Sequence, residues 1–198
     1  MDSLPENGSP RPITRWGESV MHRVLRNVDA FDDDLLLLVA DMAATMRAAD
    51  GVGLAANQVG VDLKVFVFDC PDDHGERYQG VVCNPVLELP EGRDRRLDDG
   101  DEGCLSLPGV FTSCPRPDFA VVRGLDVHGH PVEYSGDGLL ARCLQHETDH
   151  LYGTVFADRL GKRARKRLLA DAERMAEGFP PDWPVEQAEQ PQGTAGPE

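Results

Sequence analysis

Residues 145–150 read Q-H-E-T-D-H and contain the pattern H-E-x-x-H. On a helix, side chains four residues apart share one face, so His146 and His150 can direct two imidazoles at one metal ion. Glu147 lies one step round the helix, where its carboxylate can hold a water molecule and move its proton. The pattern therefore predicts a helix with two metal ligands, although the same pentapeptide also arises by chance on solvated helix faces.

The size and charge of the chain limit its class. Its 198 residues suit one domain with one core, and a net charge of −15 argues against general binding to DNA or RNA. The N-terminus is acidic and lacks an apolar signal segment, and the longest apolar run, residues 35–40, is too short to span a bilayer. Five cysteines, an odd number without a signal segment, favour reduced thiols. We therefore expect a cytoplasmic protein that binds neither DNA nor membranes.

Both ends of the chain differ in composition from its middle. Residues 1–12 and 179–198 are rich in Pro, Gly and polar residues, so we expect both segments to be disordered. Residues 13–178 remain as the single folded domain.

Hydrophobic spacing predicts the elements inside this domain. Apolar residues three and four apart predict a helix from Asp29 or Asp32 to about Ala49, and residues 156–177 read as a second long helix. The H-E-x-x-H helix starts near residue 138 and stops at Gly153. Residues 90–101 read as a charged loop or edge hairpin. Strands are expected at residues 63–68, 78–89 with a break near Asn84, 119–125 and 131–134.

Two further stretches accompany the H-E-x-x-H pattern. Residues 51–58 read G-V-G-L-A-A-N-Q, which alone indicates a tight turn, and residues 102–106 read E-G-C-L-S. The three stretches, in this order, resemble the signature of the peptide deformylase family. The resemblance covers about residues 13–177, and it implies that residues 13–178 form a catalytic domain. We expect an α+β fold in which short, mostly antiparallel strands pack around the H-E-x-x-H helix, with an N-terminal and a C-terminal helix outside.

The resemblance implies an enzyme. The family removes the formyl group from the formyl-methionine terminus of newly made bacterial polypeptides and releases formate, which is hydrolysis of a linear amide. Cys104 would join His146 and His150 as metal ligands and leave a fourth position open, as catalytic metal sites do. By resemblance the ion is Fe²⁺, with zinc, nickel or cobalt as substitutes, although the ligand types alone suggest zinc.

The resemblance also assigns the groups around the reacting carbonyl. Glu147 would move the proton of the attacking water and pass it to the departing amine. Negative charge develops on the formyl oxygen, and preorganised donors are needed there. By resemblance these donors are the side-chain amide of Gln58 and the backbone N–H of Leu105.

The resemblance implies that an apolar pocket for the methionine side chain sets substrate specificity. Arg142 departs from the family pattern, which commonly has an aliphatic residue there, and Phe111 with residues 112–114 departs after E-G-C-L-S. We therefore expect a pocket rim of altered polarity. The positions that match the family's pocket are Val52, Gly53, Leu54, Leu139, Arg142 and Cys143, next to His146.

A dense basic cluster, residues 162–167, interrupts the otherwise acidic sequence. A solvated helix face is the simplest interpretation of such a cluster. The alternative is docking on ribosomal RNA, because the C-terminal helix serves that purpose in some bacterial members and phosphates attract basic patches.

Two other functions fit part of the sequence. A metalloprotease also uses H-E-x-x-H, but Cys104 and Gln58 would have no role in it, and no third ligand pattern follows His150. A relative without catalysis would bind only metal or formylated chains, and the intact set of metal ligands and Glu147 argues against it. An assay of formate release beside a casein assay separates the three functions.

Overall fold

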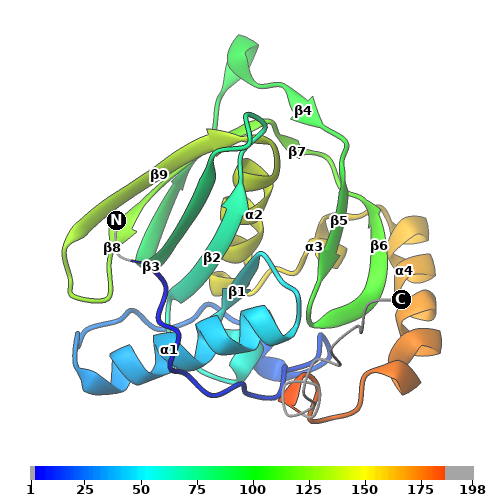
Figure 1. Cartoon of the computed structure of the whole chain (residues 1–198). Coiled ribbons are helices and arrows are strands. Elements are labelled where there is room, and N and C mark those ends of the chain that lie inside the picture. Colours follow the sequence, from blue (N-terminus) through cyan, green and yellow to red (C-terminus); the bar gives the residue numbers. More distant parts are fainter. Residues whose placement is uncertain (1–2, 186–198) are drawn as a thin grey trace, which may run out of the picture.

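A five-stranded antiparallel sheet forms the centre of the computed structural model, which describes residues 3–185 (Figure 1). The strand order is β1-β2-β3-β8-β9. The mixed helix and antiparallel strand architecture confirms the expected α+β class. The strands are β1 Gly53–Ala55, β2 Val65–Pro71, β3 Arg77–Glu88, β8 Phe119–Leu125 and β9 Pro131–Asp137.

Two small ladders flank this sheet (Figure 1). β4 (Leu97–Asp98) lies within residues 90–101, where a loop or an edge hairpin was predicted, and pairs with β7 (Arg116–Pro117). β5 (Asp101–Cys104) pairs with β6 (Leu107–Ser113), and no strand was predicted there. Glycines and a proline lower the strand preference of this stretch, and pairing with the partner strand overrides that preference.

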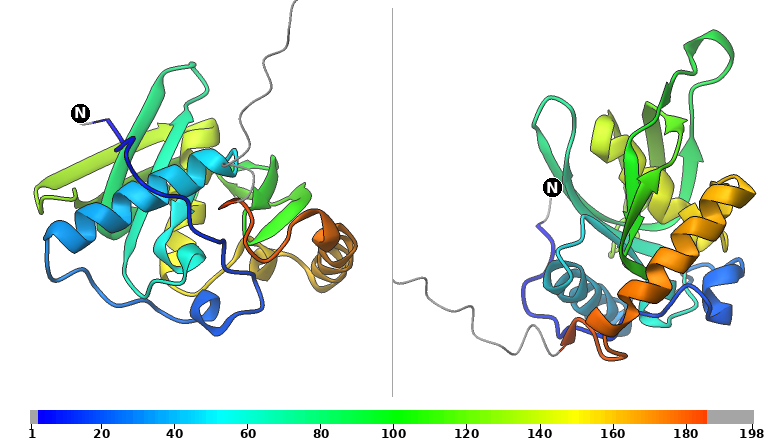
Figure 2. Two further views of the ribbon diagram at one scale, coloured as in Figure 1. Left: turned by 60° about the horizontal axis from the view of Figure 1, so that its bottom comes forward. Right: turned by 90° about the vertical axis from the view of Figure 1, so that its right-hand side faces the viewer.

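The alternation of side chains along β2 divides the core into two layers. Val65 and Val67 point to one face and pack beside α1 (Asp33–Ala48). Phe66 and Phe68 point to the other face and pack beside α2 (Gly138–Leu151). The sheet thus lies between the two helices, and α2 is the more deeply enclosed of them (Figures 1 and 2).

Both predicted helix boundaries near the sheet are confirmed. Asp32 caps α1 by accepting a hydrogen bond from the backbone N–H of Leu35 at 3.1 Å. α2 ends at Leu151, and Gly153 follows with φ of 74°. A side chain at Gly153 would meet the backbone N of Arg23 at 2.6 Å, so the chain can turn there only with glycine. The short 3-10 helices are Ser19–His22, Ala56–Val59, Gly92–Asp94 and Ala176–Gly178.

The prediction of one long helix over residues 156–177 was wrong. The chain forms α3 (Phe156–Arg159) and α4 (Lys162–Met175), and Leu160 and Gly161 between them are extended. Two features favour a break in the helix here. Gly161 has a low helix preference, and the Arg159 side chain is drawn into an ion pair with Asp149 of α2. α4 packs along β6 of the β5–β6 ladder (Figure 2).

The chain ends differ from the expected disorder. Leu4 is only 5% exposed in the layer beside α1, and Arg11 pairs with Asp41 of α1 at 2.7 Å. At the other end Trp183 is buried, and its carbonyl accepts a hydrogen bond from the N–H of Ile13 at 3.0 Å. A few apolar and charged side chains hold these segments, and a composition dominated by Pro and Gly does not reveal them.

The remaining terminal residues, 1–2 and 186–198, lie outside the described part of the chain. Within residues 3–185, the helices are too short or too polar to cross a membrane.

Candidate active site

Two histidines of α2 face one point inside the molecule. His146 and His150 are one helical turn apart, and both are buried. Their Nε2 atoms lie 3.1 Å from each other. The i, i+4 spacing read from the sequence therefore places both rings as predicted, and α2 carries them into the core instead of onto a solvated face.

Cys104 completes a group of three ligand atoms. It is the last residue of β5, and an irregularity in the β5–β6 pairing between Gly103 and Cys104 turns its thiol toward α2. The Cys104 Sγ lies 3.3 Å from His150 Nε2, and the three ligand atoms all lie within 4.8 Å of one another. Within residues 3–185 this is the group of His, Cys, Asp and Glu side chains that gathers in this way. One sulfur and two imidazole nitrogens suit a transition metal ion and leave further coordination positions open.

Glu102 fixes the orientation of His146. The Nδ1–H of His146 donates to Glu102 Oε1 at 2.7 Å, so the lone pair of Nε2 faces the other two ligand atoms. The sequence motif contains Glu102, but sequence reasoning gave it no role. No strand was expected over this stretch, so the two-residue spacing of Glu102 and Cys104 gave no sign that both side chains reach His146 and His150.

A buried network of ion pairs between side chains holds Glu102 in place. Arg116 donates to both Glu102 oxygens, at 2.6 and 2.7 Å, and to Asp149 Oδ2 at 2.8 Å. Burial alone would raise the pKa of Glu102, but hydrogen bonds and charges from Arg116 and His146 hold that pKa well below its usual range. Glu102 is therefore ionised at neutral pH beside His146. Sequence reasoning missed Arg116, and no local pattern marks this residue.

Glu147 has the environment of a proton carrier. Its side chain is buried, and Oε2 has no hydrogen-bond partner among the described residues. Burial raises the pKa of Glu147 to about 7, near the value that suits proton transfer at neutral pH. A Cβ at Gly53 would lie 2.4 Å from Glu147 Oε1, so only glycine leaves room for this carboxylate.

Gln58 presents its amide NH₂ to the same place. Its Oε1 accepts a hydrogen bond from the N–H of Ala55 at 2.9 Å, which fixes the amide so that Nε2 points toward Cys104. Nε2 lies 3.6 Å from Cys104 Sγ and 3.4 Å from the hydroxyl of Ser106. Leu105 lines the same cavity as Gln58.

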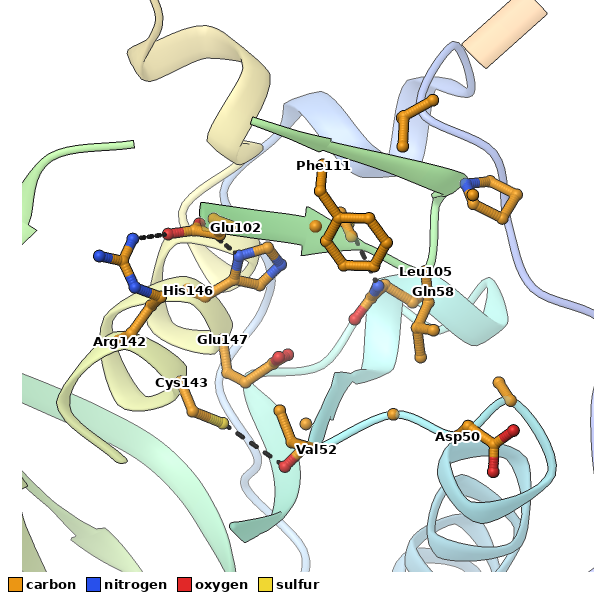
Figure 3. Close-up of a pocket in the computed structure, with 18 of the residues that line it drawn as sticks. Asp50, Val52, Gln58, Glu102, Leu105, Phe111, Arg142, Cys143, His146 and Glu147 are labelled. Atoms are coloured by element: carbon orange, nitrogen blue, oxygen red, sulfur yellow. Dashed lines mark hydrogen bonds and ion pairs between the residues drawn. The ribbon is translucent and has the colours of Figure 1, made fainter. Parts of the chain in front are cut away.

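One cavity of about 450 Å³ opens over these groups (Figure 3). Five of the six residues predicted to bind substrate line it, and Leu54 does not. Along β1 the side chains alternate, so Leu54 points to the opposite face and is buried beside α1. The five that line the cavity are Val52, Gly53, Leu139, Arg142 and Cys143.

Arg142 lines this cavity, but its charge is directed elsewhere. Nη1 donates to Glu102 Oε2 at 2.9 Å and to the carbonyl of Cys114 at 2.7 Å. Nη2 donates to Asp98 Oδ2 at 2.6 Å. Figure 3 shows the guanidinium turned toward Glu102, on the side away from Gln58. Two carboxylates therefore balance a charge that the sequence suggested would lie at the pocket rim.

Comparison with known proteins agrees with this geometry. The model of the polypeptide deformylase family matches residues 10–166. The chain is 56% identical to peptide deformylase 1 of Streptomyces avermitilis over 176 residues, which cover 88% of this chain and 80% of the relative. It is 52% identical to the peptide deformylase of Mycolicibacterium paratuberculosis over 169 residues, covering 80% and 86% of the two chains.

Solved structures give the same result for the fold. The peptide deformylase of Legionella pneumophila superposes with a TM-score of 0.75 at 34% identity, over 92% of this chain and all of the other. That of Synechococcus elongatus, solved in complex with actinonin, has a TM-score of 0.74 at 35% identity, over 87% and 91% of the two chains. The matched residues include the glycine-rich stretch, Cys104 and the H-E-x-x-H helix, so the chain belongs to the peptide deformylase family.

Proposed function

We propose that this chain hydrolyses the N-formyl group of formyl-methionine at the start of new polypeptides, with the reacting carbonyl in the cavity beside Glu147. One observation carries the assignment of roles: the buried carboxylate of Glu147, with its unpartnered Oε2, lines the same cavity as Cys104 and His146. Formylated chains are made in the bacterial cytoplasm, and this is where we place the activity.

Cys104, His146 and His150 would hold the metal ion. We propose Fe²⁺ because the family uses it, with zinc, nickel or cobalt as substitutes that the same ligand types accept. When bound, the ion would supply positive charge that polarises the formyl carbonyl and acidifies a water molecule. Glu102 would keep the His146 ring in the tautomer that presents Nε2.

The remaining steps belong to side chains of this chain. As a water oxygen bonds to the formyl carbon, Glu147 takes the proton that the water releases. The Gln58 amide and the Leu105 N–H donate to the oxygen on which negative charge develops. The carbon–nitrogen bond then breaks, and Glu147 returns the proton to the departing nitrogen. Formate and a free methionine amine are the products.

We propose that the methionine side chain lies against Val52, Leu139 and Cys143. These residues line the cavity near Glu147, and Val52 and Leu139 stay partly exposed, at 38% and 40%. Exposed apolar side chains around a partly enclosed cavity provide the contact that a thioether side chain needs.

The position of Arg142 leads to a prediction about specificity and stability. Because Glu102 and Asp98 already balance the guanidinium charge, Arg142→Ile should leave the preference for formyl-Met over formyl-Glu peptides unchanged. The same change should lower the free energy of unfolding by about 1.5–3 kcal/mol, since it removes charged hydrogen bonds to Glu102. The measurements are kcat/KM on both peptides and denaturation in urea. A gain of formyl-Met preference in the variant would instead mean that the Arg142 guanidinium acts on the bound peptide.

The activity is tested by formate release from formyl-Met-Ala-Ser with protein prepared without oxygen and loaded with Fe²⁺. Release of formate, together with no cleavage of casein, is expected. Casein cleavage without formate release would favour a metalloprotease. Binding of the peptide without turnover, at a filled metal site, would favour a relative without catalysis.

We also propose that the basic face of α4 docks on ribosomal RNA. Lys162, Arg163, Lys166 and Arg167 are exposed there, in a chain with a net charge of −15. Replacing Lys162 and Lys166 with glutamate reverses their charges and should reduce co-sedimentation with ribosomes at low salt. The matched control reverses the charges of Arg93 and Arg95, which are exposed at the 3-10 helix between β3 and β4. An equal effect of the two double variants would indicate only a general charge effect.

A further inference from the structure

Two aromatic side chains from the C-terminal segment line the active-site cavity. Phe179 and Trp183 belong to the wall of the same cavity as Glu147 and Cys143. They follow α4 and lie beyond residue 166, where the match to the family model ends. The family signature therefore assigns these two residues no role, although they line the cavity that contains Glu147.

The N-terminal segment holds this aromatic pair in place. Arg15 donates from Nη2 to the carbonyls of Phe179 and Pro180, at 2.9 and 3.1 Å. Its guanidinium also lies over the Trp183 ring, 5.6 Å from the centroid. The N–H of Ile13 donates to the Trp183 carbonyl at 3.0 Å. The segment is thus bound to the domain through its backbone and its rings, so its side chains can present a defined surface.

The rings themselves form a fixed edge-to-face pair on β6. The Phe179 and Trp183 centroids are 5.0 Å apart, with an interplanar angle of 84°. Gly109 of β6 has φ of 77°, and a Cβ there would meet the Phe179 ring at 2.8 Å. Glycine therefore lets Phe179 lie directly on the strand backbone. Phe111 of the same strand also lines the cavity and is 72% exposed, which extends the apolar surface.

We propose that Phe179 and Trp183 form a subsite for an aromatic or large apolar side chain of a substrate residue downstream of the formylated methionine. The inference rests on the proposed function. An extended peptide advances about 3.3 Å per residue. With its formyl group beside Glu147, it would continue through the same cavity past β6. The subsite offers ring faces and edges, which favour aromatic and large apolar partners over small polar ones such as serine.

The test compares peptides that differ only downstream. For formyl-Met-Ala-Phe and formyl-Met-Ala-Ser, and for the same pair lengthened by one alanine before the last residue, kcat/KM is measured with wild type and with Phe179→Ala. The wild type should favour the Phe peptide of at least one pair by about three- to tenfold, the range expected of an aromatic contact. Phe179→Ala should bring that ratio close to one, and Phe179→Tyr should restore it.

Phe119→Ala is the matched control, because Phe119 is an exposed phenylalanine of β8 that does not line the cavity. This variant should keep the wild-type ratio. A ratio unchanged by Phe179→Ala, including an equal loss on all peptides, would overturn the subsite and leave only a structural role. If no peptide yields formate, the proposed function fails. Calorimetric binding of the same peptides to wild type and to Phe179→Ala then decides the subsite by itself.

Discussion

We expect Glu147→Ala to lose about 10²- to 10⁴-fold in kcat on formylated peptides while keeping its fold and its metal, because it removes the group that moves the proton. The carboxylate is buried, Oε2 has no hydrogen-bond partner among residues 3–185, and burial raises the pKa of the group to about 7. Truncation therefore breaks no hydrogen bond to Oε2. Stability should change little, and the loss should lie in turnover.

Two further variants make this result specific. Glu147→Gln keeps the shape of the side chain but cannot carry a proton, so it should be nearly as inactive as Glu147→Ala. Glu173→Ala removes an exposed carboxylate of α4 and should behave as wild type. Formate release, metal content and the midpoint of thermal unfolding are measured for all three. Near-normal kcat in Glu147→Gln would mean that another group moves the proton.

The sequence predicted the elements whose pattern is local. The H-E-x-x-H helix, its ligands and the stop at Gly153 all follow from spacings of a few residues, and α2 has each of them. The break expected near Asn84 appears only as an irregularity, because β3 continues from Arg77 to Glu88. There φ is 52°, the pairing with β8 shifts register, and the Asn84 side chain binds both the N–H and the carbonyl of Val28. Asparagine tolerates this positive φ better than most residues.

The parts that the sequence did not predict depend on contacts between distant residues. Arg116 sits in a two-residue strand, and only folding brings it between Glu102 and Asp149. Arg142 was expected to be a polar residue at the pocket rim, but in the fold its guanidinium pairs with two carboxylates.

The segment around Trp183 read as a polar tail, because one aromatic residue carries little weight in a composition. Its burial depends on Ile13 and Arg15 at the opposite end of the chain. Rules based on spacing along the sequence do not detect such pairs, because the two partners come into contact only in the folded chain.

The second large effect is expected at Glu102. Its two oxygens accept hydrogen bonds from Arg116, Arg142 and His146, and the Glu102 and Arg116 side chains are 4% and 2% exposed. Removing one partner of a buried ion pair costs about 3–5 kcal/mol. Here it would leave Arg116 with Asp149 alone, which also pairs with Arg159. Glu102→Ala should lower the free energy of unfolding of the metal-free protein by this amount. Denaturation in urea measures it.

The same change should weaken metal binding for a separate reason. Without Glu102, the Nδ1–H of His146 loses its acceptor, so the ring is no longer held with Nε2 toward Cys104 and His150. Loss of such a supporting partner typically lowers metal affinity about 10- to 100-fold. Competition with a chelator measures this effect, in conditions where the variant is still folded.

A surface glutamate provides the matched control for both effects. Glu88 of β3 pairs with Arg123, and about half of each side chain is exposed to solvent, at 56% and 48%. Water and salt screen such a pair, so Glu88→Ala should change neither stability nor metal affinity appreciably. If Glu102→Ala were as stable as Glu88→Ala, the buried network would not hold the site together. If it were unstable but bound metal normally, Glu102 would support the fold without orienting His146.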